Sequence, residues 1–451
     1  MTTMLSIHVG HDGCVTYIKN NKIVFHTQID RYNRFKHFAV PTKSLIDELK
    51  KIDFDVFLIS YILNAEHWVE LWRDVLHNIK ELKHKKIIYA PVNNHHVYHA
   101  YCALTWRTGI KNTLVADGTG APLKNPTVFF CERESLYNET KHLITEGNEI
   151  GLRYEEFTKQ HFKDMHACGK TMAWSLHDSR AKKIQAEFER SMTHLINKWN
   201  IKDEIMFTGG CAQNVLYNSK LLKKFNKVFC DPFNGDFGLS LGSANHYLNN
   251  SISNDQIYLG IPQDVNVKLF SNYDVVDISP GDVAKILLND PVAIFQSRSE
   301  QGQRGLGNRS LLMNPMHKDA HNKLNEIKKR EWFRPFACSV LQEKADEWFD
   351  MQGIKESPHM MYVFKCKKKL KAGMAKDNNS RIQTVKKSDN LHYYNVLKEF
   401  DKLTKIPIVI NTSLNLPGEV LVETMQDLKE LFERSKLKFI YLPEINKLIK
   451  K

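Results

Sequence analysis

A hairpin signal stands near the amino terminus, in the stretch Cys14-Val15-Thr16-Tyr17-Ile18-Lys19-Asn20-Asn21-Lys22-Ile23-Val24-Phe25. Alternating apolar residues on both sides of an Asn-Asn pair predict two antiparallel strands joined by a tight turn. The polar loop Gly10-His11-Asp12-Gly13 comes just before, at a point where two strands would meet. His11 is the group in this loop that can exchange a proton near neutral pH, although a lone loop histidine is more often inert.

The composition describes an ordinary globular chain with a basic charge balance. Its 451 residues are enough for two or three domains, and 42% are hydrophobic and 25% charged. The sequence contains no apolar run long enough to span a membrane and no signal peptide, and its eight cysteines are scattered, so we expect a reducing cytoplasm. A net charge of +13 favours a polyanionic partner such as nucleic acid, although a lysine-rich surface that only aids solubility would give the same number.

Two histidines and two aspartates are candidate metal ligands. On the helix expected after residues 86–90, His95 and His99 are one turn apart on the same face, where they can hold one metal ion or simply pack. Asp117 ends the apolar run 114–116, a position typical of metal and phosphate sites. Two histidines and one carboxylate suit iron or another divalent metal. Asp236, in a glycine-flanked loop, is a plausible fourth ligand or an ordinary turn residue.

Glycines and arginines mark two candidate phosphate sites. The expected strand 204–207 runs into Gly209 and Gly210, whose backbone amides could approach a nucleotide. The loop 295–310 holds three arginines and three glycines directly after an apolar run, and by itself it is as well explained as a solvated basic loop. Three more arginines follow in two later segments. Six arginines, together with strand-end polar residues, would be costly to collect without a phosphate ligand.

These stretches, taken together, resemble the O-carbamoyltransferases of the nodulation-factor and antibiotic (tobramycin, cephamycin) type. The resemblance extends over nearly the whole chain, and its most specific pieces are residues 31–37, 209–214, 298–310 and 330–336. It implies a mixed α/β protein. The amino-terminal domain would be actin-like, related to the tRNA threonylcarbamoyl-transfer enzymes with an ATPase and kinase-like fold, and the carboxy-terminal domain would be YrdC-like. We expect the actin-like domain in residues 1–255, a linker in 256–280 and the YrdC-like domain in 281–451.

The resemblance also implies a two-step reaction and a role for each candidate residue. The YrdC-like domain would make carbamoyl-adenylate from carbamoyl phosphate and ATP, with Mg²⁺ on the ATP, and the actin-like domain would transfer the carbamoyl group to a hydroxyl. A metal ion, Fe²⁺ or another divalent ion, would bind His95, His99, Asp117 and Asp236. His11 would help deprotonate the acceptor and Lys36 would bind ligand, while the carbamoyl-adenylate would contact Gly118, Gly209, Gly210 and Asn214. Carbamoyl phosphate and ATP would contact Arg298, Arg304, Arg309, Arg330, Arg334, Arg381, Asn411 and Ser413.

Two departures from the family pattern bear on function. Residues 374–379 replace a segment that usually contains a histidine, so a non-catalytic or only adenylating nucleotide-binding module stays an alternative. The helical region between Met172 and Glu204 is short, which could open the acceptor side to a large molecule. With the positive net charge, this favours DNA carrying 5-hydroxymethylcytosine, as in phage-type genomes, as the acceptor; a small sugar or antibiotic-like alcohol is the runner-up.

Overall fold

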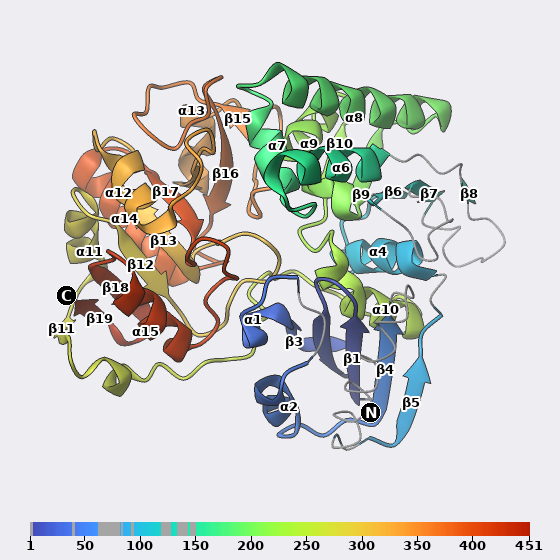
Figure 1. Ribbon diagram of the computed structural model, residues 1–451, viewed down its shortest axis with the longest axis horizontal. Helices are drawn as coiled ribbons and strands as arrows, with labels where there is room; N and C mark the ends of the chain where they lie inside the picture. Colours follow the sequence, from blue (N-terminus) through green and yellow to red (C-terminus); the bar gives the residue numbers. More distant parts are fainter. Residues whose placement is uncertain are drawn as a thin grey trace. The chain divides into compact units, whose positions relative to one another are not determined.

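The computed structural model describes residues 3–37, 41–61, 82, 84–91, 94–118, 128–132, 143–144 and 150–451. The chain divides into two compact units, Met1–Asp255 and Gln256–Lys451. Both units combine helices with β-sheets (Figure 1), which confirms the expected mixed α/β class. Among the described helices, none is both long enough and apolar enough to cross a membrane.

The first unit begins with a five-stranded sheet in the order β3-β2-β1-β4-β5. Strands β1, β2 and β3 are antiparallel neighbours, whereas β4 pairs in parallel with both β1 and β5. The predicted hairpin is confirmed as β2 and β3, and Asn20 and Asn21 adopt the left-handed backbone conformation that its turn requires. The strands are β1 (Thr3–Val9), β2 (Cys14–Lys19), β3 (Lys22–Gln28), β4 (Val56–Tyr61) and β5 (Lys86–Tyr89).

A second five-stranded sheet of the same unit repeats this topology, in the order β10-β9-β6-β7-β8. Its first three strands in the sequence are again antiparallel neighbours, and its last two again add in parallel beside the first. Two copies of this arrangement in one unit are the topology of actin-like ATPases, so the fold expected for this half is confirmed. The strands are β6 (Asn112–Ala116), β7 (Val128–Glu132), β8 (Leu143–Ile144), β9 (Glu204–Thr208) and β10 (Lys227–Cys230).

Helices α4 (His95–Leu104) and α10 (Leu239–Tyr247) pack tightly against each other in the first unit. Gly242 allows this approach, because a Cβ atom there would lie 1.9 Å from the carbonyl oxygen of Tyr98. The pair brings the start of α4 next to the short 3-10 helix η4 (Asp236–Gly238), which precedes α10. The other described helices of this unit are α1 (Asp30–Asn33), α2 (Lys43–Leu49), α6 (Ile150–Phe162), α7 (Cys168–Trp174), α8 (Ser179–Lys198), η3 (Gly210–Gln213) and α9 (Val215–Leu221).

The second unit is built on a nine-stranded mixed sheet in the order β11-β19-β18-β12-β13-β17-β14-β16-β15. Residues 256–280 belong to this unit and differ from the linker expected there: β11 pairs with β19, and the amide of Gly260 donates to the carbonyl of Ser299. Their polar, Gly- and Pro-containing composition predicts irregular backbone, but it does not tell whether that backbone packs on a domain. The strands are β11 (Asp274–Asp277), β12 (Val292–Phe295), β13 (Arg309–Met313), β14 (Ala337–Leu341), β15 (Val363–Lys365), β16 (Asn379–Val385), β17 (Ile408–Ser413), β18 (Phe439–Leu442) and β19 (Lys447–Lys450).

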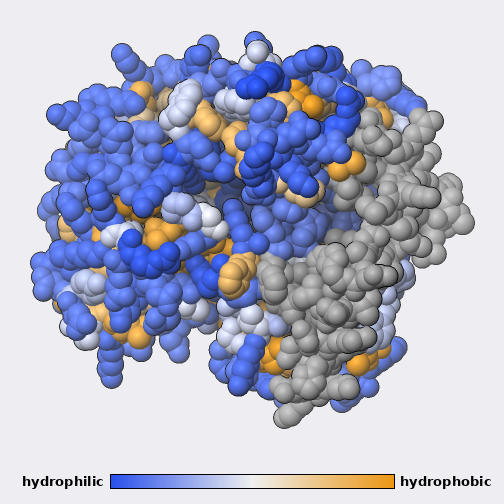
Figure 2. Space-filling model, in the orientation of Figure 1, coloured by the Kyte–Doolittle hydropathy of each residue, from blue (hydrophilic) through white to orange (hydrophobic). Residues whose placement is uncertain are grey.

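Helices cover both faces of this sheet, and each face has its own apolar core. Val292 and Ile294 of β12 pack with α11 (Pro280–Leu287) and α14 (Leu391–Thr404), whereas the alternate residues Ala293 and Phe295 pack with α12 (Ala320–Lys328) and α15 (Met425–Arg434). The described surface in Figure 2 is mostly hydrophilic, with apolar residues in small separate spots. The remaining helices are η5 (Val267–Phe270), η6 (Gln342–Lys344), α13 (Ala345–Trp348) and η7 (Pro443–Ile445).

Candidate metal centre and arginine cluster

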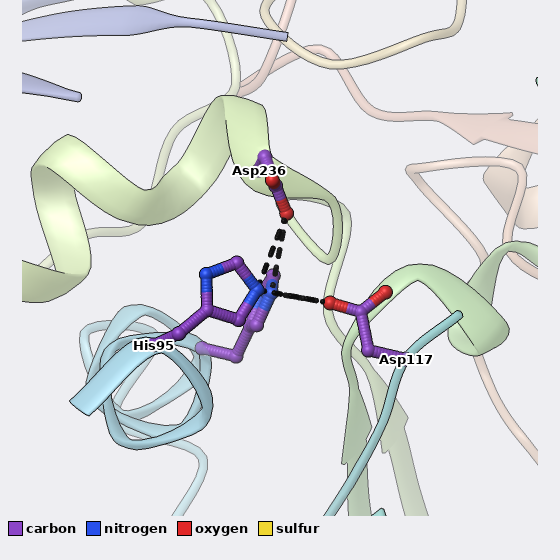
Figure 3. A group of neighbouring side chains, drawn as sticks. His95, Asp117 and Asp236 are labelled. Carbon is purple, nitrogen blue, oxygen red and sulfur yellow. Dashed lines mark hydrogen bonds and ion pairs between the residues drawn. The ribbon is translucent and has the colours of Figure 1, made fainter. Parts of the chain in front are cut away.

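The four side chains expected to bind a metal converge in the first unit (Figure 3). His95 and His99 each place Nε2 3.1 Å from Oδ2 of Asp117, and their distances to Oδ1 of Asp236 are 3.6 and 3.5 Å. The histidines come from the first turns of α4, Asp117 follows β6 directly, and Asp236 begins η4. One ligand atom from each residue lies within 4.8 Å of the others, so a single ion can reach all four.

The negative charges of the two carboxylates in this group are balanced by protonated imidazole. A divalent cation could take the place of the protons and keep this balance. Burial alone would raise the pKa of Asp117, but hydrogen bonds from His95 and His99 outweigh it and hold that pKa far below its usual range. Burial would lower the pKa of His99, yet Asp117 and Asp236 raise it to about 9. Protons on imidazole therefore compensate the carboxylates in the metal-free protein. Two imidazole nitrogens and two carboxylate oxygens fit a divalent first-row metal ion that replaces those protons.

Backbone amides of two glycines orient Asp117. Its Oδ1 accepts hydrogen bonds from the amides of Gly118, at 2.9 Å, and Gly210, at 3.2 Å, so that Oδ2 faces the histidines. Gly209 has a φ of 87°, and a Cβ atom there would lie 2.2 Å from the carbonyl oxygen of Ala116. Only glycine lets the loop after β9 come this close to β6. The amides that the resemblance assigns to a nucleotide thus support a candidate metal ligand here.

We call His95, His99, Asp117 and Asp236 the metal group. His11 contacts this group through Asp236. Its Nδ1 lies 3.0 Å from Oδ2 of Asp236, and its side chain is 41% exposed, whereas that of Asp236 is 4% exposed. The ring of His166 lies 5.3 Å from that of His11 and 4.6 Å from that of His37, whose Nδ1 is 2.7 Å from Oδ1 of Asp12. Lys36 is exposed in the turn that precedes His37. This turn therefore lies beside the metal group.

Glu155 on α6 is a neighbour of the metal group that the sequence did not reveal. Its carboxylate packs over Gly118, where a Cβ atom would lie 2.2 Å from Oε1. Burial and then the charge of Asp117 raise the pKa of Glu155 to about 8. Gly151 lies so near Asp117 that a Cβ atom would be 2.5 Å from its carbonyl oxygen. Gly151, a glycine in the first turn of α6, was the signal in the sequence that another backbone segment packs closely against this helix.

Asn214 has a local structural function. Its Oδ1 accepts from the amide of Tyr217 at the start of α9, at 3.1 Å. Its side-chain amide also exchanges hydrogen bonds of 3.0 and 3.1 Å with that of Gln185 on α8. These contacts fix Asn214 as the helix cap behind the Gly209–Gly210 turn.

Four of the six candidate arginines form a cluster in the second unit, which we call the arginine cluster: Arg304, Arg330, Arg334 and Arg381. Burial and the charges of the other members lower the pKa of Arg304 to about 10 and that of Arg330 to about 9. Nη1 of Arg334 is 3.2 Å from Oε2 of Glu331, and among the ion pairs of the described residues this is the one carboxylate that pairs with any of the four cations. Guanidinium groups stay protonated in proteins, so the lowered pKa values express first the cost of burying these charges and then their mutual repulsion, and a bound polyanion would offset both.

Arg309 and Arg298 stand outside the arginine cluster. The guanidinium of Arg309 is fully buried, lies 3.6 Å from the ring centroid of Phe295, and donates to the backbone carbonyls of Gln296, Ser297, Asn308 and Glu423. It holds the loop 295–310 in shape. Arg298 is half-buried, and its charge is not among those that lower the pKa values of Arg304, Arg330 and Arg381.

Strand β17 lies beside the loop that carries Arg304. A Cβ atom at Gly305 would be 2.7 Å from Cα of Ser413, so the two backbones touch. Asn411 reaches the carbonyl of Gly305 from the same strand, at 3.2 Å. Lys328, whose buried Nζ donates to the carbonyls of Ser413 and Asn415 at 2.6 Å each, was missed by sequence reasoning, although it is only two residues from Arg330. The altered residues 374–379 form an ordered turn that leads into β16 and Arg381.

Residues 283–450, which contain the arginine cluster, match the family model of the carbamoyltransferase C-terminus. The chain is 27% identical to an uncharacterised protein of Methanocaldococcus jannaschii over 94% of its own length and 95% of that protein. It is 32% identical to nodulation protein NolO of Bradyrhizobium diazoefficiens over 54% of its length and 50% of that protein. Residues 283–450 thus carry a carbamoyltransferase C-terminal domain, and the chain is similar in sequence to nodulation proteins.

The nodulation relatives are longer than this chain. Nodulation protein NolNO of Sinorhizobium fredii is 32% identical over 62% of this chain but only 43% of its own length. The chain thus spans about half the length of the nodulation relatives that it matches. Among solved structures, component A of (R)-2-hydroxyglutaryl-CoA dehydratase from Acidaminococcus fermentans aligns with 55% of this chain and 97% of its own, at 15% identity and a TM-score of 0.35.

Proposed function

We propose that this protein transfers a carbamoyl group from carbamoyl phosphate to a hydroxyl group, with consumption of ATP, in the cytoplasm. The observation that carries the proposal is the arginine cluster in the unit that matches the carbamoyltransferase C-terminus, where the described ion pairs set one carboxylate against four mutually repelling guanidinium groups. Such a group is costly unless its ligand has several negative charges, and ATP and carbamoyl phosphate both do.

The first step takes place at this cluster. Water converts carbamoyl phosphate into carbamate and phosphate, and a carbamate oxygen then attacks the α-phosphorus of ATP. Pyrophosphate leaves with the electron pair of the broken P–O bond, and carbamoyl-adenylate is formed. Arg304, Arg330, Arg334 and Arg381 neutralise the charge on the phosphoryl oxygens, together with Mg²⁺ on ATP. Lys328 and Gly305 keep the strand and loop backbones in register beside them.

The second step takes place at the metal group of the first unit. The acceptor oxygen bonds to the carbamoyl carbon, the bond from that carbon to the AMP oxygen breaks, and the hydroxyl proton passes to Nε2 of His11, which Asp236 orients through Nδ1. Burial would lower the pKa of His11, but Asp236 raises it to about 10 in the metal-free protein; a divalent ion on Asp236 would offset that carboxylate charge and leave Nε2 free to accept the proton.

His95, His99, Asp117 and Asp236 would hold a divalent ion, Fe²⁺ in our proposal. When bound there, the ion acts as a Lewis acid that polarises the carbamoyl carbonyl. Amides of Gly118 and Gly210 keep Asp117 in place.

For the acceptor we propose a hydroxymethylated base in DNA, specifically 5-hydroxymethylcytosine of a phage-type genome. The net charge of +13 favours a polyanion. In addition, Phe35 is 71% exposed between the cations Arg34 and Lys36, in the turn that leads to His37 beside the metal group. An exposed aromatic ring flanked by cations is typical of surfaces on which an unpaired base stacks.

The test is to incubate the protein with ATP, carbamoyl phosphate, a divalent metal and DNA containing 5-hydroxymethylcytosine, and then to digest the DNA and weigh the nucleosides. A nucleoside heavier by one carbamoyl group supports the proposal. Carbamoyl-phosphate-dependent pyrophosphate release with unchanged DNA would exclude this acceptor and direct the search to small alcohols. No pyrophosphate release under any condition would leave only a nucleotide-binding module and overturn the proposed reaction.

A further inference from the structure

Trp332 is the feature of the second unit that the proposed reaction does not use. Its side chain is 72% exposed, more than any other large hydrophobic side chain in the described part of the chain. Burial of a side chain as large and apolar as an indole stabilises a fold, and Trp332 contributes little stabilisation of this kind because it is exposed. An exposed indole offers a large flat apolar face and a polar N–H, and for this reason tryptophan is enriched at binding interfaces.

The backbone around Trp332 is held firmly. Asn325 of α12 exchanges hydrogen bonds with the backbone of Arg330, at 2.7 Å to its amide and 3.1 Å to its carbonyl. The amide of Arg334 donates to the carbonyl of Glu331 at 3.0 Å, which closes a tight turn with Trp332 at its tip. The rings of Trp332 and Phe333 are nearly perpendicular, with centroids 5.8 Å apart. The turn thus presents a fixed, exposed indole.

In the sequence of this turn, Trp332 stands between two members of the arginine cluster. Arg330 and Arg334 flank Trp332 at two residues on each side, and both take part in the mutual repulsion of the cluster. Consecutive Cα atoms are about 3.8 Å apart, so Arg330 and Trp332 lie at most about 7 Å from each other along the backbone. The ribose of a nucleotide separates its phosphates from its base by a comparable length.

We infer that Trp332 is the platform on which the adenine of ATP stacks while the arginine cluster holds the triphosphate. The inference rests on the proposed binding of ATP at the cluster. Guanidinium groups alone cannot distinguish ATP from any other polyphosphate, because they contact only phosphoryl oxygens. An indole face adds a contact that carbamoyl phosphate, pyrophosphate and phosphate cannot make. Trp332 therefore sets the preference for a nucleotide over a simple polyphosphate, and a larger purine ring stacks better than a pyrimidine.

The experiment measures binding of MgATP, MgCTP and magnesium tripolyphosphate to the full chain by calorimetry. We expect W332A to weaken ATP binding about 10- to 100-fold, W332F to retain most of it, and both variants to bind tripolyphosphate as the original protein does. L403A is the matched control, because Leu403 on α14 is also an exposed apolar residue, at 47%, and it should leave all three affinities unchanged.

Quenching of tryptophan emission by ATP gives a second readout, which W332F should largely lose. Unchanged ATP affinity in W332A overturns the inference but leaves the arginine cluster as a phosphate site. An equal loss of ATP and tripolyphosphate affinity in W332A also overturns it, because Trp332 would then support the cluster instead of a base. Failure of the original protein to bind both ATP and tripolyphosphate would instead overturn the proposed function, and this inference with it.

Discussion

Asp236 lies between His11 and the metal group: its Oδ2 is 3.0 Å from Nδ1 of His11, and its Oδ1 faces His95 and His99 at 3.6 and 3.5 Å. One carboxylate therefore serves both the proposed base and the proposed metal ion. Because the two functions share a residue, they can be separated only by changing the residues on either side of it.

His11→Asn should abolish transfer without loss of metal, because His11 is in contact with Asp236 but is not among the four candidate ligands. We expect carbamoyl transfer to fall about 10²- to 10⁴-fold, as for the removal of a general base. Asp117→Asn should remove both the metal and transfer. Metal content after dialysis, measured by mass spectrometry, separates the two variants. Both should release pyrophosphate at the original rate, since that step uses the second unit; loss of pyrophosphate release in either would contradict two separate sites.

Metal binding should become tighter as the pH rises towards 9. Burial would lower the pKa of His99, but Asp117 and Asp236 raise it to about 9, so at pH 7.5 the metal-free protein carries a proton that the ion must displace. Below pH 9 the dissociation constant should fall about tenfold per pH unit for each proton released. Calorimetry with Co²⁺ in buffers of different ionisation enthalpy should detect the released proton. Proton-independent binding would show that His99 is not a ligand.

Protonation of His99 should also affect the stability of the metal-free protein. The pKa of His99 in the folded protein lies above its ordinary value of 6.5, so its contribution is complete below pH 6.5 and is lost as the pH rises through about 9. The melting temperature of the metal-free protein should therefore fall across this window. With metal bound the fall should be smaller, because the ligands are already deprotonated. Differential scanning calorimetry at pH 6.5 and 9 measures both; an equal fall in both forms would contradict the assignment.

The histidine and aspartate positions of the metal group could be predicted from the sequence, since helical spacing aligns His95 with His99 and a strand end presents Asp117. What the glycines do could not be predicted. A Gly-Gly turn after a strand is typical of nucleotide sites, yet here the amides of Gly118 and Gly210 reach Asp117, because sheet pairing brings β9 beside β6. Long-range strand pairing decides such contacts, and local sequence does not encode it.

The repeated topology of the first unit could likewise be predicted from the sequence only in part. The β2–β3 hairpin has a strong local signal, whereas β4 and β9 join their sheets in parallel to strands far away in the sequence. Residues 256–280 show the same limit, since their composition indicates loops but not the pairing of β11 with the distant β19. Partners of this kind are fixed by packing across the whole unit.

Neutralising one member of the arginine cluster should stabilise the protein in the absence of ligand. In Arg330→Gln, burial of a charge and repulsion from Arg334 and Arg381 are both removed, so the melting temperature should rise by a few degrees. Saturating tripolyphosphate should stabilise the original protein by about 2.7 kcal/mol at 100 times its Kd, and the variant much less. Lys329→Gln is the matched control, because Lys329 is the exposed neighbour with the same charge. A lower melting temperature of ligand-free Arg330→Gln would contradict the repulsion.

Arg309→Ala should unfold the second unit more easily, even though the resemblance groups this residue with the ligand-binding arginines. Its guanidinium is fully buried and donates to four backbone carbonyls, which the substitution would leave without those donors. We expect a loss of about 3–5 kcal/mol in the free energy of unfolding, as for removal of one partner of a buried charged network. Arg309→Lys should recover little of the lost stability, because the single ammonium group of lysine cannot reach all of the carbonyls to which the planar guanidinium donates.

Arg298→Ala provides the comparison from the same loop. Arg298 is half-buried, so its loss should change the free energy of unfolding by about 1 kcal/mol or less. Urea unfolding followed by tryptophan fluorescence and far-ultraviolet circular dichroism measures both variants. If Arg309→Ala left stability unchanged but removed ATP binding, Arg309 would be a ligand residue after all. The buried position of Arg309 and its stacking on Phe295 predict the opposite result. The loop 295–310 loses its structure, whereas the charges of the arginine cluster are unchanged.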